Sequence, residues 1–247
     1  MVGMLVGLTG VGGGSLMTPL LVLLFGFHPS TAVGTDLLYA SVTKTAGTMV
    51  HGKQQTVDWR IVRALASGSV PAAIVTLLLM SRVGTMTGEA SRILSLLLGA
   101  SLLLTGIAVL FRPWILRWAG ANIDAMGVRR AGRWTIALGA ALGILVSITS
   151  VGAGALGTTA LLILYPRLPV PRIAGSDIAH AVPLTLIAGI GHWLMGSFDF
   201  ALMLALLLGS IPGIIAGSLL STRTRDSVLR PVLAVTLLIV AAKLLFA

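Results

Sequence analysis

The stretch GVGGGSL at positions 10–16 decides the fold, because a similar glycine-rich stretch, VGAGAL at 151–156, follows about 140 residues later. Rarer residue types recur at nearly the same spacing, whereas matches between leucines would mean little in so apolar a chain. The pairs separated by 141 positions are Gly34 and Gly175, Asp36 and Asp177, His51 and His192, Asp58 and Asp199, Pro71 and Pro212, and Arg82 and Arg223. Matched acids, histidines, prolines and arginines in one register predict a duplicated unit.

The composition predicts a membrane protein. Of the 247 residues, 56% are hydrophobic and 10% are charged, and apolar runs approach the length of about 20 residues that crosses a bilayer as a helix. The net charge of +10 lies almost wholly in short loops, which favours orientation in a membrane over nucleic-acid binding. The chain has no cysteine, which excludes disulfides, thiolate metal sites and cysteine nucleophiles. The first residues lack the basic region of a cleaved signal peptide, so we expect none.

Four apolar segments are expected in each half of the chain. They are 1–25, 31–51, 60–81 and 92–111, then 134–165, 172–194, 199–221 and 227–246. The stretch 112–133 between the halves is basic and polar, which is typical of a linker at the membrane surface. The predicted organisation is a first transmembrane repeat at 1–111, this linker, and a second transmembrane repeat at 134–247.

The glycine-rich segments determine the predicted topology. As one helix, 134–165 would be about 48 Å long at ~1.5 Å per residue, too long for a hydrocarbon core of ~30 Å, so a broken or re-entrant helix fits better. If all eight segments crossed the membrane, seven Lys and Arg residues of the loops would lie on one side of it and nine on the other. If the glycine segments are re-entrant, each half crosses the membrane three times and the two halves have opposite orientations. Thirteen of the basic loop residues then lie on one side of the membrane and three on the other. Counting therefore favours inverted repeats, with loops 52–63, 112–133, 166–172 and 222–230 in the cytoplasm.

The opening stretch GVGGGSLMTPLLVLLFGFHPSTAVGTDLL, at 10–38, resembles the TauE/SafE family of sulfite exporters, whose pattern is a glycine run, a proline and then a G-T-S-L-like element. The resemblance covers nearly the whole chain. It includes GTTALLILYPRLPVPRIAGSDI at 157–178 and the loop patterns VDW at 57–59 and FDF at 198–200. It implies a multi-pass permease of the cytoplasmic membrane that moves sulfite, sulfonates or related organosulfur anions. The chain departs from the pattern at Asp36 and Asp177, where the family commonly has serine.

The glycine runs agree with an anionic substrate. Successive glycines let backbone N–H groups turn inward as a concave nest, and a half-helix that begins there adds the positive end of its dipole. An oxyanion would then need no full positive charge. The residues assigned to this nest are Gly12, Gly13, Gly14, Ser15, Gly152, Ala153 and Gly154. The alternative is that these glycines only let helices pack closely.

The second segment of each half carries ionisable residues inside an apolar environment. Charged groups near the bilayer centre are costly, so we expect Asp36, Lys44 and Asp177 to face inward, toward a cavity or a partner. The two acids are candidates for proton coupling, and the alternative is that they stabilise the starts of their helices. His180, one turn from Asp177, is a candidate for proton handling, and Lys44 is a candidate for supplying positive charge to an anion.

Other polar residues have structural interpretations. Asp58 and Asp199 are expected to cap the helices that follow them. His51 and His192 end their segments, where an interfacial or loop-bonding histidine is expected. Pro71 and its counterpart in the second half lie deep in apolar segments, where a hinge and a static kink remain alternatives.

The sequence thus predicts an all-α polytopic membrane protein with two inverted repeats, each made of a re-entrant glycine segment and three transmembrane helices. The predicted function is secondary transport of a small organosulfur oxyanion by alternating access, with a site near the midplane. The site would comprise the glycine tips with Thr35, Asp36, Lys44, Ser176, Asp177 and His180. No phosphate-binding loop, cofactor, metal site or enzymatic nucleophile is indicated. A cation or metal permease that uses the Asp and His residues is the alternative, and homo-oligomerisation stays open.

Overall fold

The computed structural model describes residues 14–83, 88–116, 128–152, 154–209 and 226–246, and within these ranges the regular elements are helices, without a strand. The long helices are α3 (Pro29–Lys53), α4 (Trp59–Val83), α5 (Gly88–Leu110), α7 (Val128–Thr149), α9 (Val170–Leu194) and α11 (Asp226–Phe246). The short helices are α2 (Gly14–Phe25), α8 (Ala155–Leu164) and a helix described over Phe200–Gly209. The protein is therefore all-α. By length and composition, α4, α5, α7 and α9 suffice to cross a membrane.

The predicted segments at 31–51, 60–81, 92–111, 172–194 and 227–246 correspond to α3, α4, α5, α9 and α11. The predicted segment 134–165 is two helices, α7 and α8, separated at the glycine motif. Helix α7 begins at Val128, inside the stretch assigned to the linker, because the arginines there extend the helix beyond its apolar part. The beginning of segment 1–25 and the end of segment 199–221 lie outside the described residues.

Helices α3 and α9 pack against each other in antiparallel directions, and glycines bring their ends close to the neighbouring turns. A Cβ atom at Gly34 of α3 would clash with the carbonyl of Ser197. A Cβ atom at Gly175 of α9 would approach the carbonyl of Thr56 at 2.5 Å. Gly34 and Gly175 are one of the pairs separated by 141 positions, and so are Thr56 and Ser197. The same contact thus occurs at both ends of the helix pair.

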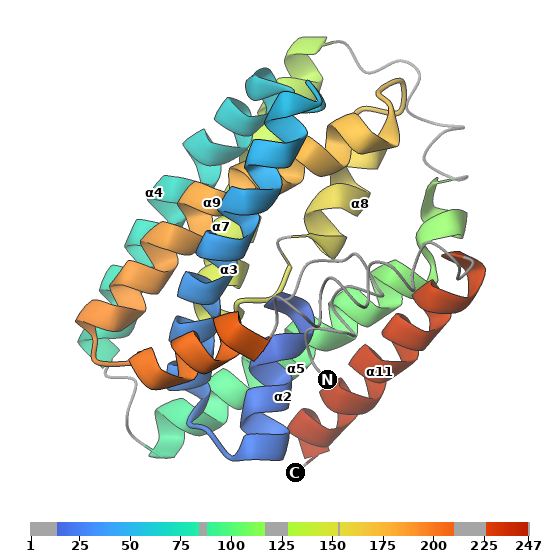
Figure 1. Ribbon diagram of the computed structural model, residues 1–247. Coiled ribbons are helices and arrows are strands. Elements are labelled where there is room, and N and C mark those ends of the chain that lie inside the picture. The colour runs from blue at the N-terminus through green and yellow to red at the C-terminus, as the bar shows by residue number, and fades with distance from the viewer. Residues whose placement is uncertain (1–13, 84–87, 117–127, 153, 210–225, 247) are drawn as a thin grey trace.

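Helices α4 and α7 run in parallel and approach closely through small residues. Cβ atoms at Gly139 and Gly143 of α7 would clash with the carbonyls of Leu65 and Ser69 on α4. Glycines permit this backbone contact, which is a common way for helices to associate in membranes. Because α4 also packs against α9, the helices α3, α4, α7 and α9 form one group (Figure 1).

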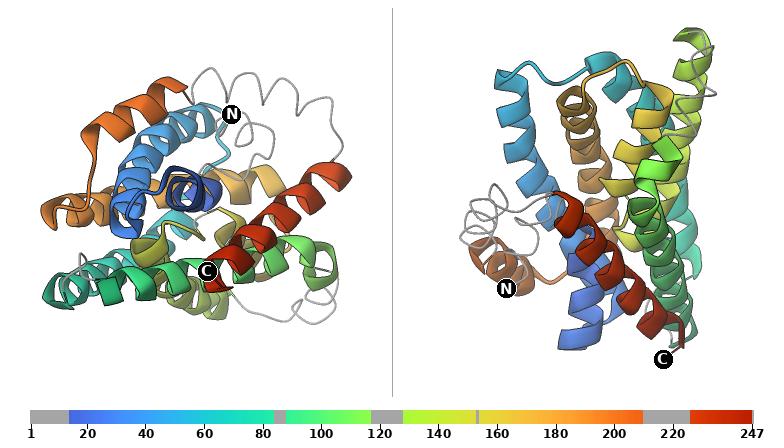
Figure 2. Two further views of the ribbon diagram at one scale, coloured as in Figure 1. Left: turned by 90° about the horizontal axis from the view of Figure 1, so that it is seen from below. Right: turned by 90° about the vertical axis from the view of Figure 1, so that its right-hand side faces the viewer.

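Helices α5 and α11 form a second, antiparallel pair. Gly99 of α5 faces Leu245 of α11, and Gly106 faces Leu238. Leu98 and Leu237 belong to the hydrophobic core between them. Both views of Figure 2 show the two helices running beside each other along one flank of the group that contains α3 and α9.

The second glycine segment enters and leaves the bundle at the same end. Thr135, near the beginning of α7, forms a 2.8 Å hydrogen bond with the hydroxyl of Tyr165, which follows α8. Between these points the chain reverses at a turn in which Ser150, Gly152 and Gly154 have φ values of 58°, 113° and 136°. Glycine adopts such values without strain, so this turn explains the glycine motif of the second half. The segment thus returns to the end of the bundle at which it enters, and a re-entrant position in the membrane stays a prediction.

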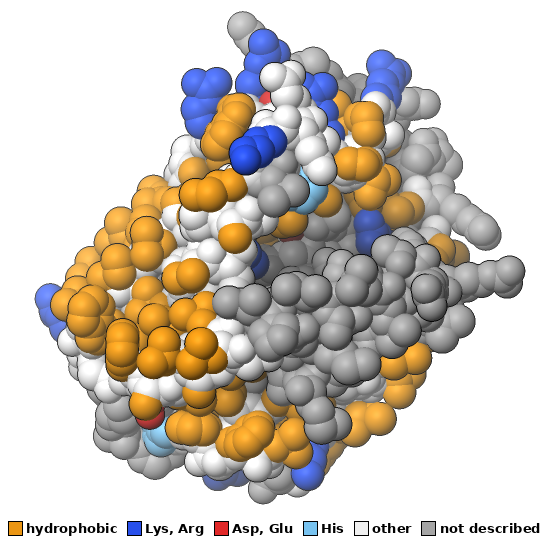
Figure 3. Space-filling model, viewed as in Figure 1, with side chains coloured by type: hydrophobic (Ala, Val, Ile, Leu, Met, Phe, Trp, Pro, Cys, Tyr) orange, Lys and Arg blue, Asp and Glu red, His pale blue; other side chains and the backbone are white. Residues whose placement is uncertain are grey.

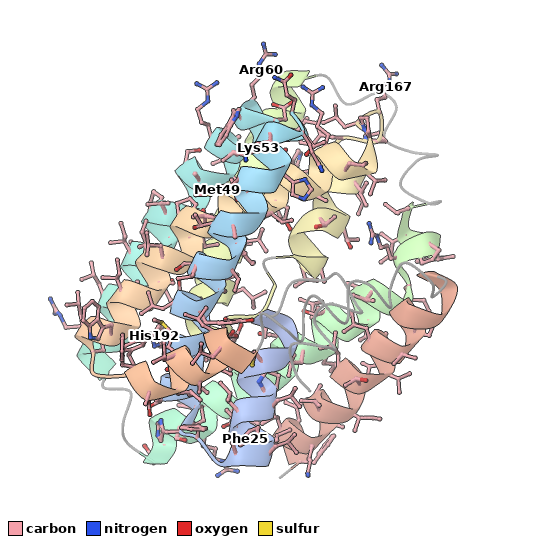
Figure 4. The ribbon with its side chains drawn as sticks, viewed as in Figure 1. Phe25, Met49, Lys53, Arg60, Arg167 and His192 are labelled. Atoms are coloured by element: carbon pink, nitrogen blue, oxygen red, sulfur yellow. The ribbon has the colours of Figure 1, made fainter. Side chains whose placement is uncertain are left out.

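Positive side chains gather at one end of the bundle. Lys53, Arg60 and Arg167 lie together at the upper end in Figure 4, whereas Phe25 and His192 lie lower. Figure 3 shows the same gathering of Lys and Arg at the upper end, above a largely hydrophobic flank. If all eight segments crossed the membrane, Arg60 and Arg167 would lie at opposite ends. Re-entrant glycine segments would place Arg60 and Arg167 at the same end, which is where both residues lie. Assignment of this end to the cytoplasm stays a prediction.

Candidate functional site

Asp36 lies in the interior, on α3, and is completely buried. Its Oδ2 atom accepts hydrogen bonds from Thr18 of α2 at 2.6 Å and from Ser150 of the turn after α7 at 2.9 Å. Ser150 is a non-glycine residue in the left-handed region, with φ 58°. The carboxyl group thus joins α3, the short helix α2 and the turn of the second glycine segment.

Asp177 has a matching environment on α9. It is 1% exposed, and its Oδ2 atom accepts a 2.9 Å hydrogen bond from Thr158 of α8. Gly157 lies so close to the other carboxyl oxygen that a Cβ atom there would clash with it. Thr18 and Thr158 are separated by 140 positions, the spacing of the glycine motifs, so each acid is held by the corresponding threonine of its own half.

Within the described part of the chain, each of the two acids has one carboxyl oxygen that makes no hydrogen bond. Among the described residues, Oδ1 of Asp36 and Oδ1 of Asp177 are buried and make no hydrogen bond. A buried polar atom without a partner is costly, and such atoms mark places where a proton, water or ligand binds. The two Oδ1 atoms are therefore candidates for exchange with a ligand or a proton.

Lys44 carries the positive charge of this region. It is half-buried on α3, eight residues after Asp36, which corresponds to about 12 Å along a helix. Its ammonium group interacts electrostatically with the carboxyl groups of Asp177 and Asp36. The structure therefore brings together one cation and two carboxyl groups from α3 and α9, as the inward orientation predicted for them requires. Their role in binding stays a prediction.

His180 is completely buried on α9 and contacts α4. Its Nε2 atom lies 2.8 Å from the hydroxyl of Ser69, and its Nδ1 atom has no hydrogen-bond partner among the described residues. The hydrogen bond of His180 with Ser69 thus joins α9 to the neighbouring helix α4, and not to Asp177, which lies one turn away on α9. His180 remains a candidate for proton handling, with Ser69 as the group that orients its ring.

Thr35 and Ser176 precede the two acids, but their hydroxyl groups serve the backbone. The hydroxyl of Thr35 accepts a 3.0 Å hydrogen bond from the N–H of Asp199. The hydroxyl of Ser176 accepts a 2.8 Å bond from the N–H of Asp58 and donates to the carbonyl of Arg172 at 2.7 Å. The bonds with Asp199 and Asp58 connect the two halves of the chain, which is a structural role. A contact of both residues with the substrate stays a prediction.

The glycine nests are described in part. Gly12, Gly13 and Ala153 lie outside the described residues. Gly14 is the first described residue of α2, which continues through Ser15, and Gly154 immediately precedes α8. Thr18 and Thr158 each follow the corresponding glycine by four residues, which places each hydroxyl about one turn into a short helix. Both short helices thus begin near the buried acids.

The family model of the sulfite exporter TauE/SafE matches residues 1–244. The chain belongs to this family. It is 39% identical over 245 residues to the probable membrane transporter protein YjnA of Bacillus subtilis, covering 99% of this chain and 96% of that protein. It is 25% identical to the probable membrane transporter protein YdhB of the same organism, over 100% and 97% of the two chains. No solved structure matches the chain.

A probable membrane transporter protein of Xylella fastidiosa is 28% identical over 90% of this chain and 82% of that protein. With its apolar helices, this TauE/SafE family member is a multi-pass transporter of the cell membrane and not an enzyme.

Four hydroxyl residues of the TauE/SafE site were not singled out from the sequence: Thr18, Ser69, Ser150 and Thr158. A signal existed for Thr18 and Thr158, because their separation equals that of the glycine motifs. No such signal existed for Ser150, whose contact with Asp36 depends on how the two halves fold together.

Two further observations bear on the site. No group of three or more His, Cys, Asp or Glu residues in the described ranges is placed to hold a metal ion. A cavity of about 660 Å³ lies between α4, α5 and α7, but it is apolar and none of the predicted site residues lines it. The buried acids and this cavity therefore lie in different parts of the protein.

Proposed function

We propose that this transporter moves sulfite or a similarly small organosulfur oxyanion, coupled to protons, by alternating access. The observation that carries the proposal is the placement of Lys44 with the buried carboxyl groups of Asp36 and Asp177, on two helices from different halves of the chain. The family description supports the class of substrate.

The charges suggest how coupling works. With both acids ionised, one ammonium group faces two carboxylates, and the site has a net negative charge that opposes entry of an anion. When one acid is protonated the charges balance, and when both are protonated the site is positive. Burial strengthens these interactions because little water screens them. Anion binding and proton uptake therefore favour each other.

The unpartnered Oδ1 atoms support this mechanism. Thr18, Ser150 and Thr158 donate to Oδ2 atoms, and so the hydroxyl groups can hold the acids in place whether Oδ1 carries a proton or not. The orientation of each acid is thereby preserved while its charge changes.

The helix arrangement suggests the moving parts. We propose that residues 1–111 and 134–247 are two inverted repeats that rock against each other. Contacts that occur in pairs 141 positions apart support this proposal: Asp199 with Thr35 matches Asp58 with Ser176, and the Gly34 contact matches the Gly175 contact. Inverted repeats with broken helices at their interface commonly give alternating access.

Proteoliposomes would test the function. We expect labelled sulfite to accumulate in vesicles with an imposed pH gradient when the side of addition is acidic, and accumulation to collapse with a protonophore. Thiosulfate and a taurine-like sulfonate serve as competitors, and empty liposomes as the control. Gradient-driven uptake of a divalent cation, with no effect of these anions, would instead support the cation permease.

A further inference from the structure

We propose that the apolar cavity between α4, α5 and α7 binds a phospholipid whose headgroup carries a phosphate and a primary ammonium group, as in phosphatidylethanolamine. The cavity would hold one acyl chain, while Arg82 and Glu89 at its end would hold the headgroup. The proposal is independent of the transported substrate.

The walls of the cavity suit a hydrocarbon chain. They include Leu79 of α4, Ile93 and Leu97 of α5, and Ile144 of α7, which are all at least 40% exposed. Thr76 also lines the cavity, but its hydroxyl donates to the carbonyl of Ala72 at 2.8 Å, so that this polar group is already satisfied. The cavity thus offers an apolar surface to the membrane.

The length of the cavity corresponds to one leaflet. Its lining on α4 extends from Gly68 to Met80, twelve residues apart, which is about 18 Å at ~1.5 Å per residue. Half of a ~30 Å hydrocarbon core is about 15 Å. An acyl chain that enters beside Met80 would therefore reach the bilayer midplane near Gly68.

Opposite charges lie where the headgroup would be. On α4 the lining residues recur at helical spacing, and Arg82 continues this stripe one turn after Leu79. On α5 the stripe is continued by Glu89, one turn before Ile93. Both side chains are exposed, at the end where α4 finishes and α5 begins. An arginine matches a phosphate and a carboxylate matches an ammonium group, so the pair is complementary to a zwitterionic headgroup.

Native mass spectrometry of the full-length protein would test this. The protein would be released from mixed micelles with equal amounts of phosphatidylethanolamine, phosphatidylglycerol and phosphatidylcholine of one chain composition. We expect one retained phosphatidylethanolamine per chain, in preference to the other two. Arg82→Gln should lower retention of phospholipid about fivefold, in keeping with the contribution of one arginine near a membrane surface. Glu89→Gln should abolish the preference for the primary amine and leave phosphatidylglycerol retained.

Matched variants keep the test specific. Arg92→Gln also removes an exposed arginine from α5, but Arg92 lies outside the stripe and retention should not change. Ala72→Leu fills the cavity and should reduce retention of all three lipids, whereas Ala242→Leu on the exposed side of α11 should not. Equal retention of the three lipids by the wild type, or unchanged retention in both Arg82→Gln and Glu89→Gln, would overturn the proposal. So would a dimer that buries this cavity without lipid.

Discussion

Asp36 and Asp177 occupy corresponding positions but have different surroundings. Asp36 accepts hydrogen bonds from two hydroxyl groups, one of them from the other half, whereas Asp177 accepts one within the described residues, from Thr158. Hydrogen bonds to a carboxylate stabilise its charged form. The bonds to Asp36 also connect the two halves of the chain, whereas the bond to Asp177 stays within the second half.

Replacement of the acids tests the proton coupling. Asn has nearly the shape of Asp but cannot ionise, so Asp36→Asn combined with Asp177→Asn should keep the fold and some anion exchange. Acceleration by a pH gradient should disappear. The measurement is sulfite flux into proteoliposomes with and without the gradient. Flux that keeps its full pH dependence in the double variant would leave both acids with a structural role only.

Lys44→Met tests the source of positive charge at the site. The change removes the cation and keeps a side chain of similar length, so we expect sulfite affinity to fall about tenfold or more, as for the loss of a poorly solvated charge contact. Lys53→Met, at the exposed end of the same helix, is the matched control and should bind sulfite normally. Isothermal titration in detergent provides the comparison. Unchanged sulfite binding together with altered cation binding would argue for a cation permease.

Gly157→Ala tests the position of Asp177. An added methyl group would clash with the carboxyl group, which must then move away from Thr158 and Lys44. We expect transport to fall at least tenfold, while the helices remain folded, because a small displacement in a site has a large effect on rate. Gly132→Ala is the control, since nothing lies within 4 Å of a methyl group there. Normal flux through Gly157→Ala would show that the placement of Asp177 is not critical.

At the scale of elements, the packing of α3 against α9 depends on glycine at two positions. A methyl group at Gly34 would overlap the Ser197 carbonyl and the His192 side chain, both held in place by neighbouring structure. Overpacking typically costs about 1–3 kcal/mol, so Gly34→Ala should lower the free energy of unfolding by that amount. Gly175→Ala should behave alike. Gly52→Ala, at the open end of α3, is the control, and thermal unfolding in detergent gives the comparison.

Most helices could be predicted from the sequence because apolar runs in a membrane protein have few alternative structures. The expected caps are confirmed as well: Asp58 accepts a bond from the N–H of Arg60 at 3.0 Å, and Asp199 from that of Leu202 at 2.8 Å. His51 bonds within its turn, to Thr56, at 2.8 Å. These interactions join residues close in sequence, so local patterns suffice to predict them.

Contacts between distant residues were harder to predict. An interfacial or loop-bonding role for His192 is wrong, because His192 is completely buried and its Nε2 lies 2.8 Å from the carbonyl of Ser147 on α7. The last turn of α9 is covered by α7, which its own sequence does not reveal. Helix α4 continues without interruption through Pro71, and its bounds agree equally with a hinge and with a static kink.

At the scale of the whole molecule, the distribution of charge predicts orientation. The stretches 112–133 and 222–230 should face the cytoplasm, and loop 82–92 the opposite side, because basic loops remain inside. Since the chain has no native cysteine, single replacements Ser91→Cys and Ser227→Cys can be labelled cleanly in intact cells. An impermeant maleimide should label Cys at 91 and not at 227. Labelling of both from outside would contradict the inverted arrangement.

The pairing of α3 with α9 also has a consequence for biosynthesis. Helix α3 leaves the ribosome with Asp36 and Lys44, each of which opposes insertion by about 2.5–3.5 kcal/mol at the centre of an isolated helix. The groups of the second half that shelter them are made more than one hundred residues later: Ser150 lies 114 residues after Asp36, and α9, which carries Asp177, begins at Val170. During that interval, insertion of α3 alone into the lipid is unfavourable. We therefore expect the translocon to retain α3, or to leave it at the membrane surface, until the second half of the chain arrives.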